Sequence, residues 1–175
     1  METVGQDKIE IVTLPVFSWQ EYKELRLRAL KTEPQAFYSS YEKEVVYPDD
    51  KWQQRLRNVE NGKSWMFFAR LNGKLVGIVG GYRSKEDIHN NRVQIWGVYV
   101  DPQARRKGIA KSLMEKMLEE LKKHSDIAIV RTEVNVDQQP AKKLYEKFGF
   151  EVTGTESLVL GDGLEHKELI MELRL

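Results

Sequence analysis

The chain has 175 residues, of which 41% are hydrophobic and 31% are charged. This composition is typical of a soluble globular protein, and the length suits one domain with a substantial core but not two. The formal net charge is only +1, so no strong overall field favours nucleic acid or an anionic membrane. Cysteine is absent, which excludes disulfides, thiolate metal ligands and a cysteine nucleophile.

The N-terminal sequence lacks the apolar region of a secretory signal, and no apolar run approaches the length needed to cross a membrane. We therefore expect a cytoplasmic protein that binds neither membrane nor nucleic acid. The sequence contains no internal repeat and no linker-like stretch, so residues 1–175 are expected to form a single domain.

The first third of the chain predicts one strand and two helices. Residues 9–14 form a short apolar run that ends at a proline and predict a strand. Apolar residues at helical spacing predict helices over about 18–33 and 49–61, the second of which ends at an Asn-Gly pair. Between these helices, residues 35–48 are aromatic without a clear period, and they predict a loop or a short turn of helix.

The middle of the chain predicts three strands of one sheet. Residues 64–71 and 74–82 are β-rich and are joined by Asn72-Gly73, the strongest short hairpin signal. A polar connection over residues 83–91 leads to the third strand, at 92–100.

The last part of the chain alternates helices and strands. An apolar stripe predicts a long helix over residues 107–124, and a strand-like run follows at 127–134. Pro140, at a first-turn position, opens a further helix. Two strands, at 150–160 and 165–173, complete the order β-α-α-β-β-β-α-β-α-β-β. The predicted fold class is therefore α/β, with an α+β mixed sheet.

A basic turn at residues 105–110, with the sequence Arg-Arg-Lys-Gly-Ile-Ala, lies between a strand that stops near Pro102 and the long helix. The first N–H groups of a helix have no internal partner and carry partial positive charge. Gly108 lets an anion approach this backbone and Ala110 keeps the next turn small, so the basic turn predicts a phosphate site. On charge alone, it would be an ordinary solvated cluster.

Two blocks carry a resemblance to a known family. The spacing Arg-x-x-Gly-x-Ala at residues 105–110 resembles the pyrophosphate-binding signature of the GCN5-related N-acetyltransferase (GNAT) superfamily. Residues 141–150 are similar to its Ala-x-x-Leu-Tyr-Glu-Lys-x-Gly-Phe block, and the element order is similar over about 9–173. The resemblance implies the GNAT acyl-CoA N-acyltransferase fold. It also implies direct transfer of the acetyl group of acetyl-CoA to a primary amine of a small molecule or peptide, in a ternary complex.

The resemblance further implies where acetyl-CoA lies. Its pantetheine arm would lie between the strands at 94–100 and 127–134 and pair with main-chain groups near Val98 and Val100. Its pyrophosphate would rest on backbone N–H groups of residues 106–111. The full set of implied coenzyme-binding residues is Val98, Val100, Arg105, Arg106, Lys107, Gly108, Ile109, Ala110, Lys111, Gln138 and Tyr145.

The chain departs from the family's pattern at two of these positions. The family usually has glycine where Arg106 stands, so the turn is expected to form with a side chain present, which could itself face a phosphate. The family often has asparagine where Gln138 stands. The amide group is kept there, but it is one methylene farther from the main chain.

Acetyl transfer requires a neutral amine, a donor for the developing oxyanion and a proton for the leaving thiolate. The resemblance assigns the last role to Tyr145, which could instead be a core tyrosine on an apolar helix face. The main-chain N–H of Val98 is the expected oxyanion donor. Glu133 is the only acidic residue in the strands expected to line the cleft, so it is the candidate base. The alternative is that Glu133 forms a salt bridge and a water relay acts as the base.

Other features exclude some functions and leave others open. His89, His124 and His166 lie in different elements without ligand spacing, so no metal is expected. The aromatic residues between Phe37 and Trp52 either cover the acceptor or form a small core under a loop. The lack of an obvious carboxylate base allows a non-catalytic acyl-CoA sensor, and a longer acyl-CoA donor is a further alternative. Dimers are common in the family, so a homodimer is compatible with the resemblance.

Overall fold

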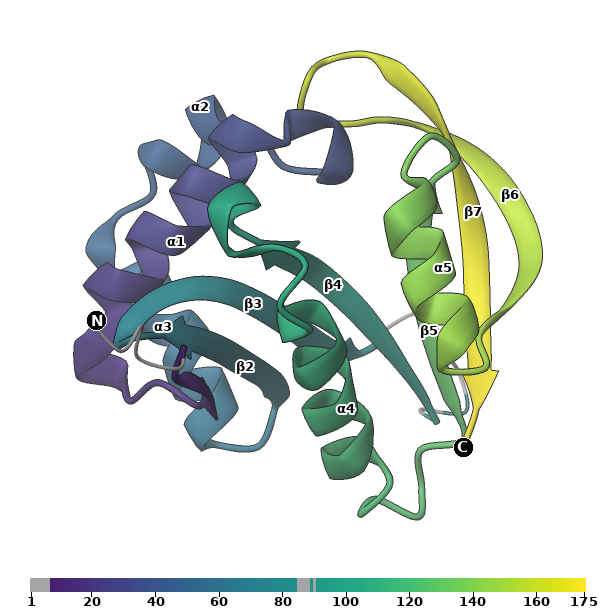
Figure 1. The fold of residues 1–175 in the computed structure, drawn as a ribbon, viewed down its shortest axis with the longest axis horizontal. Helices are drawn as coiled ribbons and strands as arrows, with labels where there is room; N and C mark the ends of the chain where they lie inside the picture. Colours follow the sequence, from purple (N-terminus) through teal and green to yellow (C-terminus); the bar gives the residue numbers. More distant parts are fainter. Residues whose placement is uncertain (1–6, 85–88, 90) are drawn as a thin grey trace, which may run out of the picture.

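A seven-stranded sheet forms the centre of the molecule, in the order β1-β2-β3-β4-β5-β7-β6 (Figure 1). The computed structural model describes residues 7–84, 89 and 91–175. Neighbouring strands in the described part of the chain pair antiparallel, except β4 and β5, which are parallel. The strands are β1 (Ile9–Val12), β2 (Ser64–Leu71), β3 (Lys74–Arg83), β4 (Arg92–Val100), β5 (Ile129–Asn135), β6 (Glu151–Val159) and β7 (Glu165–Arg174). The α-helices are α1 (Trp19–Thr32), α2 (Tyr41–Val45), α3 (Asp49–Glu60), α4 (Ile109–Leu121) and α5 (Gln139–Lys147).

The predicted order of helices and strands is confirmed, and the differences lie mainly at element ends. Helix α4 begins at Ile109 rather than at Lys107, because Gly108 has a φ of 77° and cannot belong to a right-handed helix. The aromatic segment contains the short helix α2. The predicted connection over residues 83–91 lies only partly within the described residues. None of the helices described here is both long and apolar enough to span a membrane.

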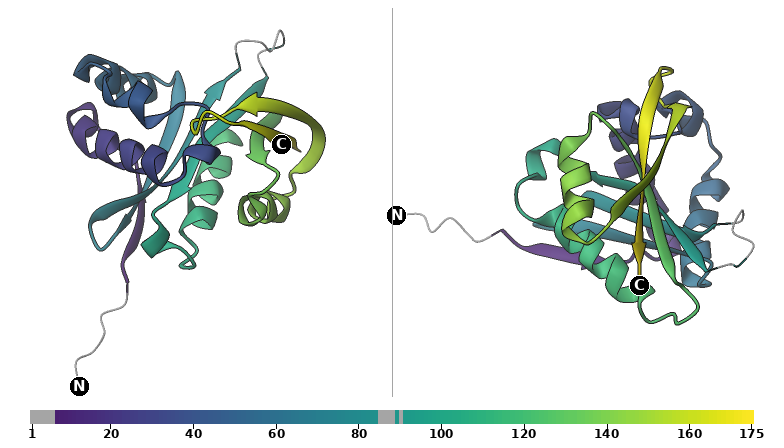
Figure 2. Two further views of the ribbon diagram at one scale, coloured as in Figure 1. Left: turned by 90° about the horizontal axis from the view of Figure 1, so that it is seen from above. Right: turned by 90° about the vertical axis from the view of Figure 1, so that its right-hand side faces the viewer.

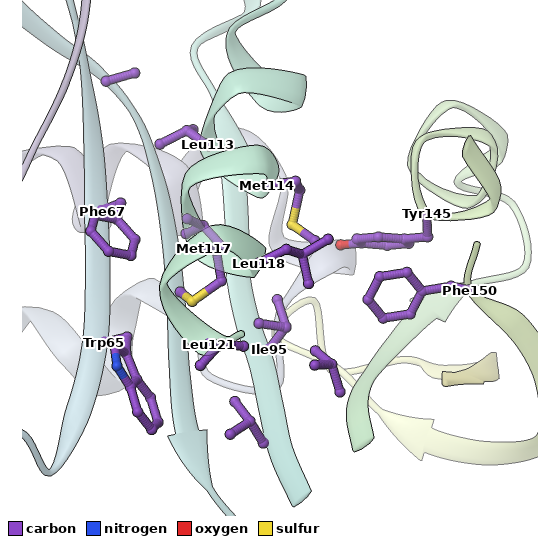
Figure 3. Packing of buried hydrophobic residues seen from close by; sticks show 14 of the residues in the cluster. Trp65, Phe67, Ile95, Leu113, Met114, Met117, Leu118, Leu121, Tyr145 and Phe150 are labelled. Atoms are coloured by element: carbon purple, nitrogen blue, oxygen red, sulfur yellow. The ribbon is translucent and has the colours of Figure 1, made fainter. Parts of the chain in front are cut away.

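Hydrophobic side chains cover both faces of the sheet, and helices pack on each face. Alternate residues of β2 point to opposite sides. Trp65 and Phe67 pack in the core that α4 covers, whereas Met66 and Phe68 pack in the core of α1 and α3. Figure 2 (left) shows the purple and blue helices α1 and α3 on one side of the sheet and the green helices α4 and α5 on the other. Figure 3 shows the α4 core from close by.

Strands β4 and β5 pair only near their beginnings. Arg92–Gln94 pair with Ile129–Arg131. Both strands continue beyond this point, β4 to Val100 and β5 to Asn135, and the described residues form no further ladder between them. Figure 1 shows the two strands diverging toward their carboxyl ends. This divergence positions the candidate site.

A bulge in β4 lies beside the divergence. Two residues of β4, Gly97 and Val98, lie opposite a single residue of β3, Val79. Gly97 adopts a φ of 67°, a left-handed conformation that favours glycine. The ring of Trp96 covers Gly80, where an added Cβ would lie only 2.2 Å from a ring atom. A bulge bends its strand, which accounts for the separation of β4 from β5.

Candidate active site

A cavity of about 670 Å³ opens where β4 and β5 diverge. Its walls come from β4, β5, β6, β7, α5 and the segment around the short 3-10 helix Pro34–Ala36. A cavity of this size between diverging strands is a strong candidate for a ligand site. Its charged lining residues are Arg26, Glu33, Arg92, Arg131, Glu133, Glu156 and Glu168.

Three glutamates from three neighbouring strands line one side of this cavity, and we call Glu133, Glu156 and Glu168 the acid wall. In strand register, Glu168 of β7 lies opposite both Glu156 of β6 and Asn135 of β5. Glu133 is two residues before Asn135 and therefore lies on the same face of the sheet. Glu133 is the only acidic residue in the two strands expected to line the cleft, but β6 and β7 also line it and add Glu156 and Glu168.

Glu133 is held by two neighbouring side chains. Its Oε1 accepts a hydrogen bond from Arg131 Nε at 2.8 Å, and its Oε2 accepts one from Gln94 Nε2 at 2.6 Å. Arg131 also reaches Glu156, at 4.0 Å. Glu133 therefore forms the salt bridge that the alternative prediction describes, and its role as base stays a prediction.

Glu168 is buried in the acid wall without a comparable partner. The residue is 4% exposed, and its Oε1 accepts no hydrogen bond from any described residue. Burial and the negative charges of Glu133 and Glu156 raise the pKa of Glu168 to about 7, while His166 acts in the opposite sense. A carboxyl group with this pKa exchanges its proton near neutral pH.

Tyr145 belongs both to the hydrophobic core and to the cavity lining. Figure 3 shows its hydroxyl oxygen directed from α5 toward Met114 and Leu118 of α4. Burial raises the pKa of Tyr145 to about 12, although a hydrogen bond with Thr132 lowers it in part. The hydroxyl group is therefore protonated at neutral pH. Both sequence interpretations of Tyr145, core residue and site residue, are compatible with this position.

The basic turn has the backbone conformation of an anion site. Arg106 has a φ of 63° and Gly108 a φ of 77°, so the turn forms with a side chain at the first left-handed position, as expected. Among the described residues, no group accepts a hydrogen bond from the backbone N–H groups of residues 106–111, and no side chain caps the start of α4. These N–H groups are therefore available to an anion.

Only some of the residues predicted to contact the pantetheine arm line the cavity. Val98 and Gln138 line the cavity, whereas Val100 is not among its described lining residues. The carbonyl oxygen of Val100 accepts a hydrogen bond from Arg105 Nε at 3.0 Å. Arg105 Nη2 also donates to Glu33 at 2.8 Å. The Arg105 side chain therefore braces the end of β4 and is engaged within the protein.

The other residues of the basic turn divide between the core and the surface. Ile109 is buried, and Ala110 packs partly against the same core. Lys107 forms an ion pair with Asp7, and Lys111 pairs with an acidic residue one turn later in α4. Any anion site at this turn is thus built chiefly from backbone N–H groups and not from lysine side chains.

The aromatic segment is divided between the cavity and the hydrophobic core of α1 and α3, which we call the second core. Phe37 and Tyr38 line the cavity, whereas Trp52 is buried beneath α1 with Tyr47 packed against it. Burial, reinforced by the charges of the acid wall, raises the pKa of Tyr38 above its usual value. Tyr38 therefore stays protonated where it faces the carboxylates.

Arg26 connects the cavity to a buried ion pair. Its guanidinium lies 4.8 Å from the ring centre of Phe37 and 5.5 Å from that of Trp96, and its Nη2 donates to Glu44 Oε1 at 2.9 Å. Burial by itself would raise the pKa of Glu44, but hydrogen bonds and charge from Arg26 and Arg55 outweigh burial and lower the pKa to about 2.

His166 lies in a chain of polar side chains at the edge of the cavity. Its Nε2 is 2.7 Å from Asp162 Oδ2, and its Nδ1 is 3.1 Å from Asn135 Nδ2. Within the described part of the chain, no group of three or more histidine, aspartate or glutamate side chains is arranged to hold a metal ion.

Comparison with known proteins identifies the family. The family model described as Acetyltransferase (GNAT) family matches residues 23–150. This match covers well over half of the chain, so the chain belongs to the GNAT family and is an N-acetyltransferase with the GNAT fold.

Two curated relatives and one solved structure illustrate this similarity. L-amino acid N-acetyltransferase AaaT of Escherichia coli (strain K12) is 28% identical over 130 residues, which are 74% of this chain and 77% of that protein. N-acetylaspartate synthetase of Xenopus tropicalis is 37% identical over 116 residues, which are 63% of this chain but only 41% of that protein. The structure of yncA, a putative acetyltransferase from Salmonella typhimurium with its cofactor acetyl-CoA, matches with a TM-score of 0.81 at 16% identity. That match covers 96% of this chain and 94% of that one, and it shows a shared fold.

Glu156, Glu168 and Arg131 line the cavity, but the sequence pattern does not indicate them as site residues. Successive side chains of a strand point to opposite faces, so Glu168 lies on the face of β7 opposite Leu169 and Met171. The missing information is the strand order. Nothing in the pattern indicates that β7 inserts between β5 and β6.

Proposed function

We propose that the protein transfers the acetyl group of acetyl-CoA to the α-amino group of an amino acid, by direct attack of the amine on the thioester in a ternary complex. The relatives support this acceptor class, because they include an L-amino acid N-acetyltransferase and several N-acetylaspartate synthetases. The chain spans less than half the length of those synthetases, so the local geometry of the cavity has to carry the argument for the acceptor.

The start of α4 supports acetyl-CoA as the donor. Unpaired N–H groups at residues 106–111 would bind the pyrophosphate, since a helix start combines free donors with partial positive charge. The pantetheine arm would then follow the diverging edge of β4 and pair with main-chain groups near Val98. Gln138 lines the cavity beside this route and offers its amide to the arm.

The single observation that carries the acceptor proposal is the placement of Arg131 beside the acid wall. An amino acid presents an ammonium group and a carboxylate a few ångströms apart. The acid wall favours the ammonium. Arg131 has five N–H donors, yet its described contacts are to Glu133 and Glu156 only. Its remaining donors match a substrate carboxylate, for which a guanidinium is the best-suited partner.

The remaining catalytic groups follow from the cavity lining. The N–H of Val98, at the bulge of β4, would stabilise the oxyanion, and such a donor typically contributes about 3 kcal/mol. Tyr145, buried and protonated at neutral pH, would give its proton to the departing thiolate. Glu133, tied to Arg131 and Gln94, would orient both side chains and attract the ammonium.

A thiol-release assay with a matched set of acceptors tests this function. The set contains an amino acid, its carboxamide and the corresponding amine without the carboxyl group. We expect the carboxamide to lose about 10-fold or more in kcat/KM, because it cannot form the charged pair with Arg131. Arg131→Gln should remove that preference. Equal kcat/KM for the amino acid and its carboxamide would contradict the acceptor, and no CoA release with any amine would contradict the transfer itself.

A further inference from the structure

The three carboxylates of the acid wall differ in what binds them. Glu133 accepts hydrogen bonds from Gln94 and Arg131. Glu156 has a side chain that is 35% exposed and lies 4.0 Å from Arg131. Glu168 is 4% exposed, belongs to no ion pair among the described residues, and has an Oε1 without a hydrogen-bond partner there. Glu168 is thus the carboxylate that is both shielded from water and unpaired, and it lines the cavity.

A buried, unpaired carboxylate is costly, and such groups concentrate where a ligand or a reaction uses them. Burial and its glutamate neighbours raise the pKa of Glu168 to about 7, against the effect of His166. The charged and titratable groups around it are Arg131 and Glu133 from β5, Glu156 from β6, His166 from β7, Tyr38 from the segment before α2, and Tyr145 from α5. Near neutral pH, Glu168 can therefore both accept and release a proton.

We propose that Glu168 is the general base of the acetyl transfer. This inference rests on the proposed function, in which an amine enters the cavity as an ammonium ion. An alkyl ammonium group has a pKa of about 10 and must lose a proton before its nitrogen can attack. A carboxylate in the cavity wall with an unoccupied lone pair is placed to take that proton, and a base that titrates near the working pH is the most effective.

Each proton has a destination in this reaction. The ammonium group gives one proton to Glu168, and the nitrogen lone pair forms a bond to the thioester carbonyl carbon. The carbon–sulfur bond then breaks, and the thiolate takes the proton of the Tyr145 hydroxyl group. The attacking nitrogen, which is positively charged after it bonds to carbon, then gives a proton to the Tyr145 phenolate and restores its hydroxyl group. Glu168 releases its proton to solvent, so the products are the N-acetylated acceptor, the CoA thiol and one proton.

The test compares Glu168→Gln with the wild-type enzyme across neutral pH, using acetyl-CoA and an amino acid acceptor and following thiol release. Glutamine keeps the shape of the side chain and removes its basicity. We expect kcat to fall about 100-fold or more, the usual effect of losing a general base. The KM for acetyl-CoA should stay within about two-fold, because the pyrophosphate site is distant in the fold. The acidic limb of the wild-type kcat/KM profile, near pH 7, should disappear in the variant.

An aminooxy analogue of the acceptor distinguishes a base from a structural residue. Its nitrogen is already neutral at pH 7, so Glu168→Gln should acetylate it at close to the wild-type rate. Glu165→Gln, which alters an exposed residue of the same strand, should match the wild type with both acceptors. Glu156→Gln should move the acidic limb to lower pH, because it removes one of the charges that raise the pKa of Glu168.

The outcomes separate the two proposals. An unchanged kcat in Glu168→Gln, or an equal loss with the amino acid and the aminooxy analogue, would overturn Glu168 as the base while leaving acetyl transfer intact. Failure of the wild-type enzyme to release CoA with any amine would overturn the proposed function, and the assignment of Glu168 with it.

Discussion

Glu44 and Glu168 are two equally buried glutamates with opposite charge behaviour. They are 1% and 4% exposed, respectively. Both oxygens of Glu44 accept hydrogen bonds from arginines, Arg26 and Arg55, and these partners override burial to lower its pKa to about 2. Glu168 has burial and like charges around it, so its pKa rises to about 7. Partners, and not depth, therefore decide the charge of a buried carboxyl group here.

Buried polar groups have two different uses in this molecule. The Glu44 cluster, formed by Glu44 with Arg26 and Arg55, is satisfied within the protein and braces the helices behind the cavity. Glu168 and the N–H groups of residues 106–111 lack partners among the described residues. Satisfied groups should cost stability when they are removed, and open groups should cost function.

The largest effect is expected from breaking the satisfied cluster. Glu44→Gln should lower the free energy of unfolding by about 3–5 kcal/mol, because the buried guanidinium of Arg26 and the partly buried one of Arg55 then lack a counter-charge. Urea unfolding at pH 7, followed by circular dichroism, measures the change. Glu42→Gln, at an exposed position of the same helix, is the control and should change stability by less than about 0.5 kcal/mol. A loss for Glu44→Gln as small as that of the control would show that the cluster does not brace the fold.

Glu168→Gln should change the free energy of unfolding in the opposite direction and stabilise the protein. The pKa of Glu168 is raised from its usual 4.5 to about 7, so the folded protein binds this proton more tightly than the unfolded chain does. The wild type therefore loses stability as the pH rises from about 4.5 to about 7, by roughly 3 kcal/mol. We expect Glu168→Gln to be more stable than the wild type at pH 8 by up to this amount, and similar to it near pH 4.5. Urea unfolding at both pH values checks this, and a less stable variant at pH 8 would reveal a buried partner.

Most of the fold could be predicted because its signals are local. The hairpin at Asn72-Gly73, the apolar stripe of α4 and the basic turn each lie within a few consecutive residues. At the hairpin both residues adopt left-handed backbone, with φ values of 51° and 85°, as the pair Asn-Gly predicts. A local pattern fixes local geometry, so these elements and their order were accessible from the sequence.

The acid wall could not be predicted in the same way. Its members lie on β5, β6 and β7, and they meet only because β7 inserts between the other two strands. The period of two assigns Glu133 and Glu168 to faces of their own strands but not to a common cavity. The expectation of a base at Glu133 rests on the two strands nearest the coenzyme and takes no account of β6 and β7. Strand order is a long-range property, so the sequence pattern alone could not place Glu168 and Glu156 in the cavity.

Tyr145 is intermediate between the satisfied Glu44 cluster and the unpaired Glu168. Its hydroxyl group has a hydrogen bond with Thr132, and the residue also lines the cavity. Tyr145→Phe should lower kcat about 100-fold through loss of the proton donor. It should change the free energy of unfolding by only about 1 kcal/mol, the value of one hydrogen bond. Steady-state kinetics and urea unfolding of the same sample measure both quantities. Tyr47→Phe, in the second core, is the control for kcat. Full turnover by Tyr145→Phe would remove its role as acid.

The smallest effects are expected at the basic turn, where two substitutions separate the backbone from a side chain. Gly108→Ala meets no neighbouring atom within 4 Å, but it places a Cβ at a φ of 77°. The strain of about 1–2 kcal/mol should distort the N–H groups at the start of α4 and raise the KM for acetyl-CoA several-fold. Arg106→Gly removes a side chain from a φ of 63°, so it should leave that KM unchanged and alter stability by less than about 1 kcal/mol.

The reverse result, with KM raised by Arg106→Gly and not by Gly108→Ala, would mean that the pyrophosphate is bound by the guanidinium. The open N–H groups would then have no ligand, and the contrast with the Glu44 cluster would hold for Glu168 alone.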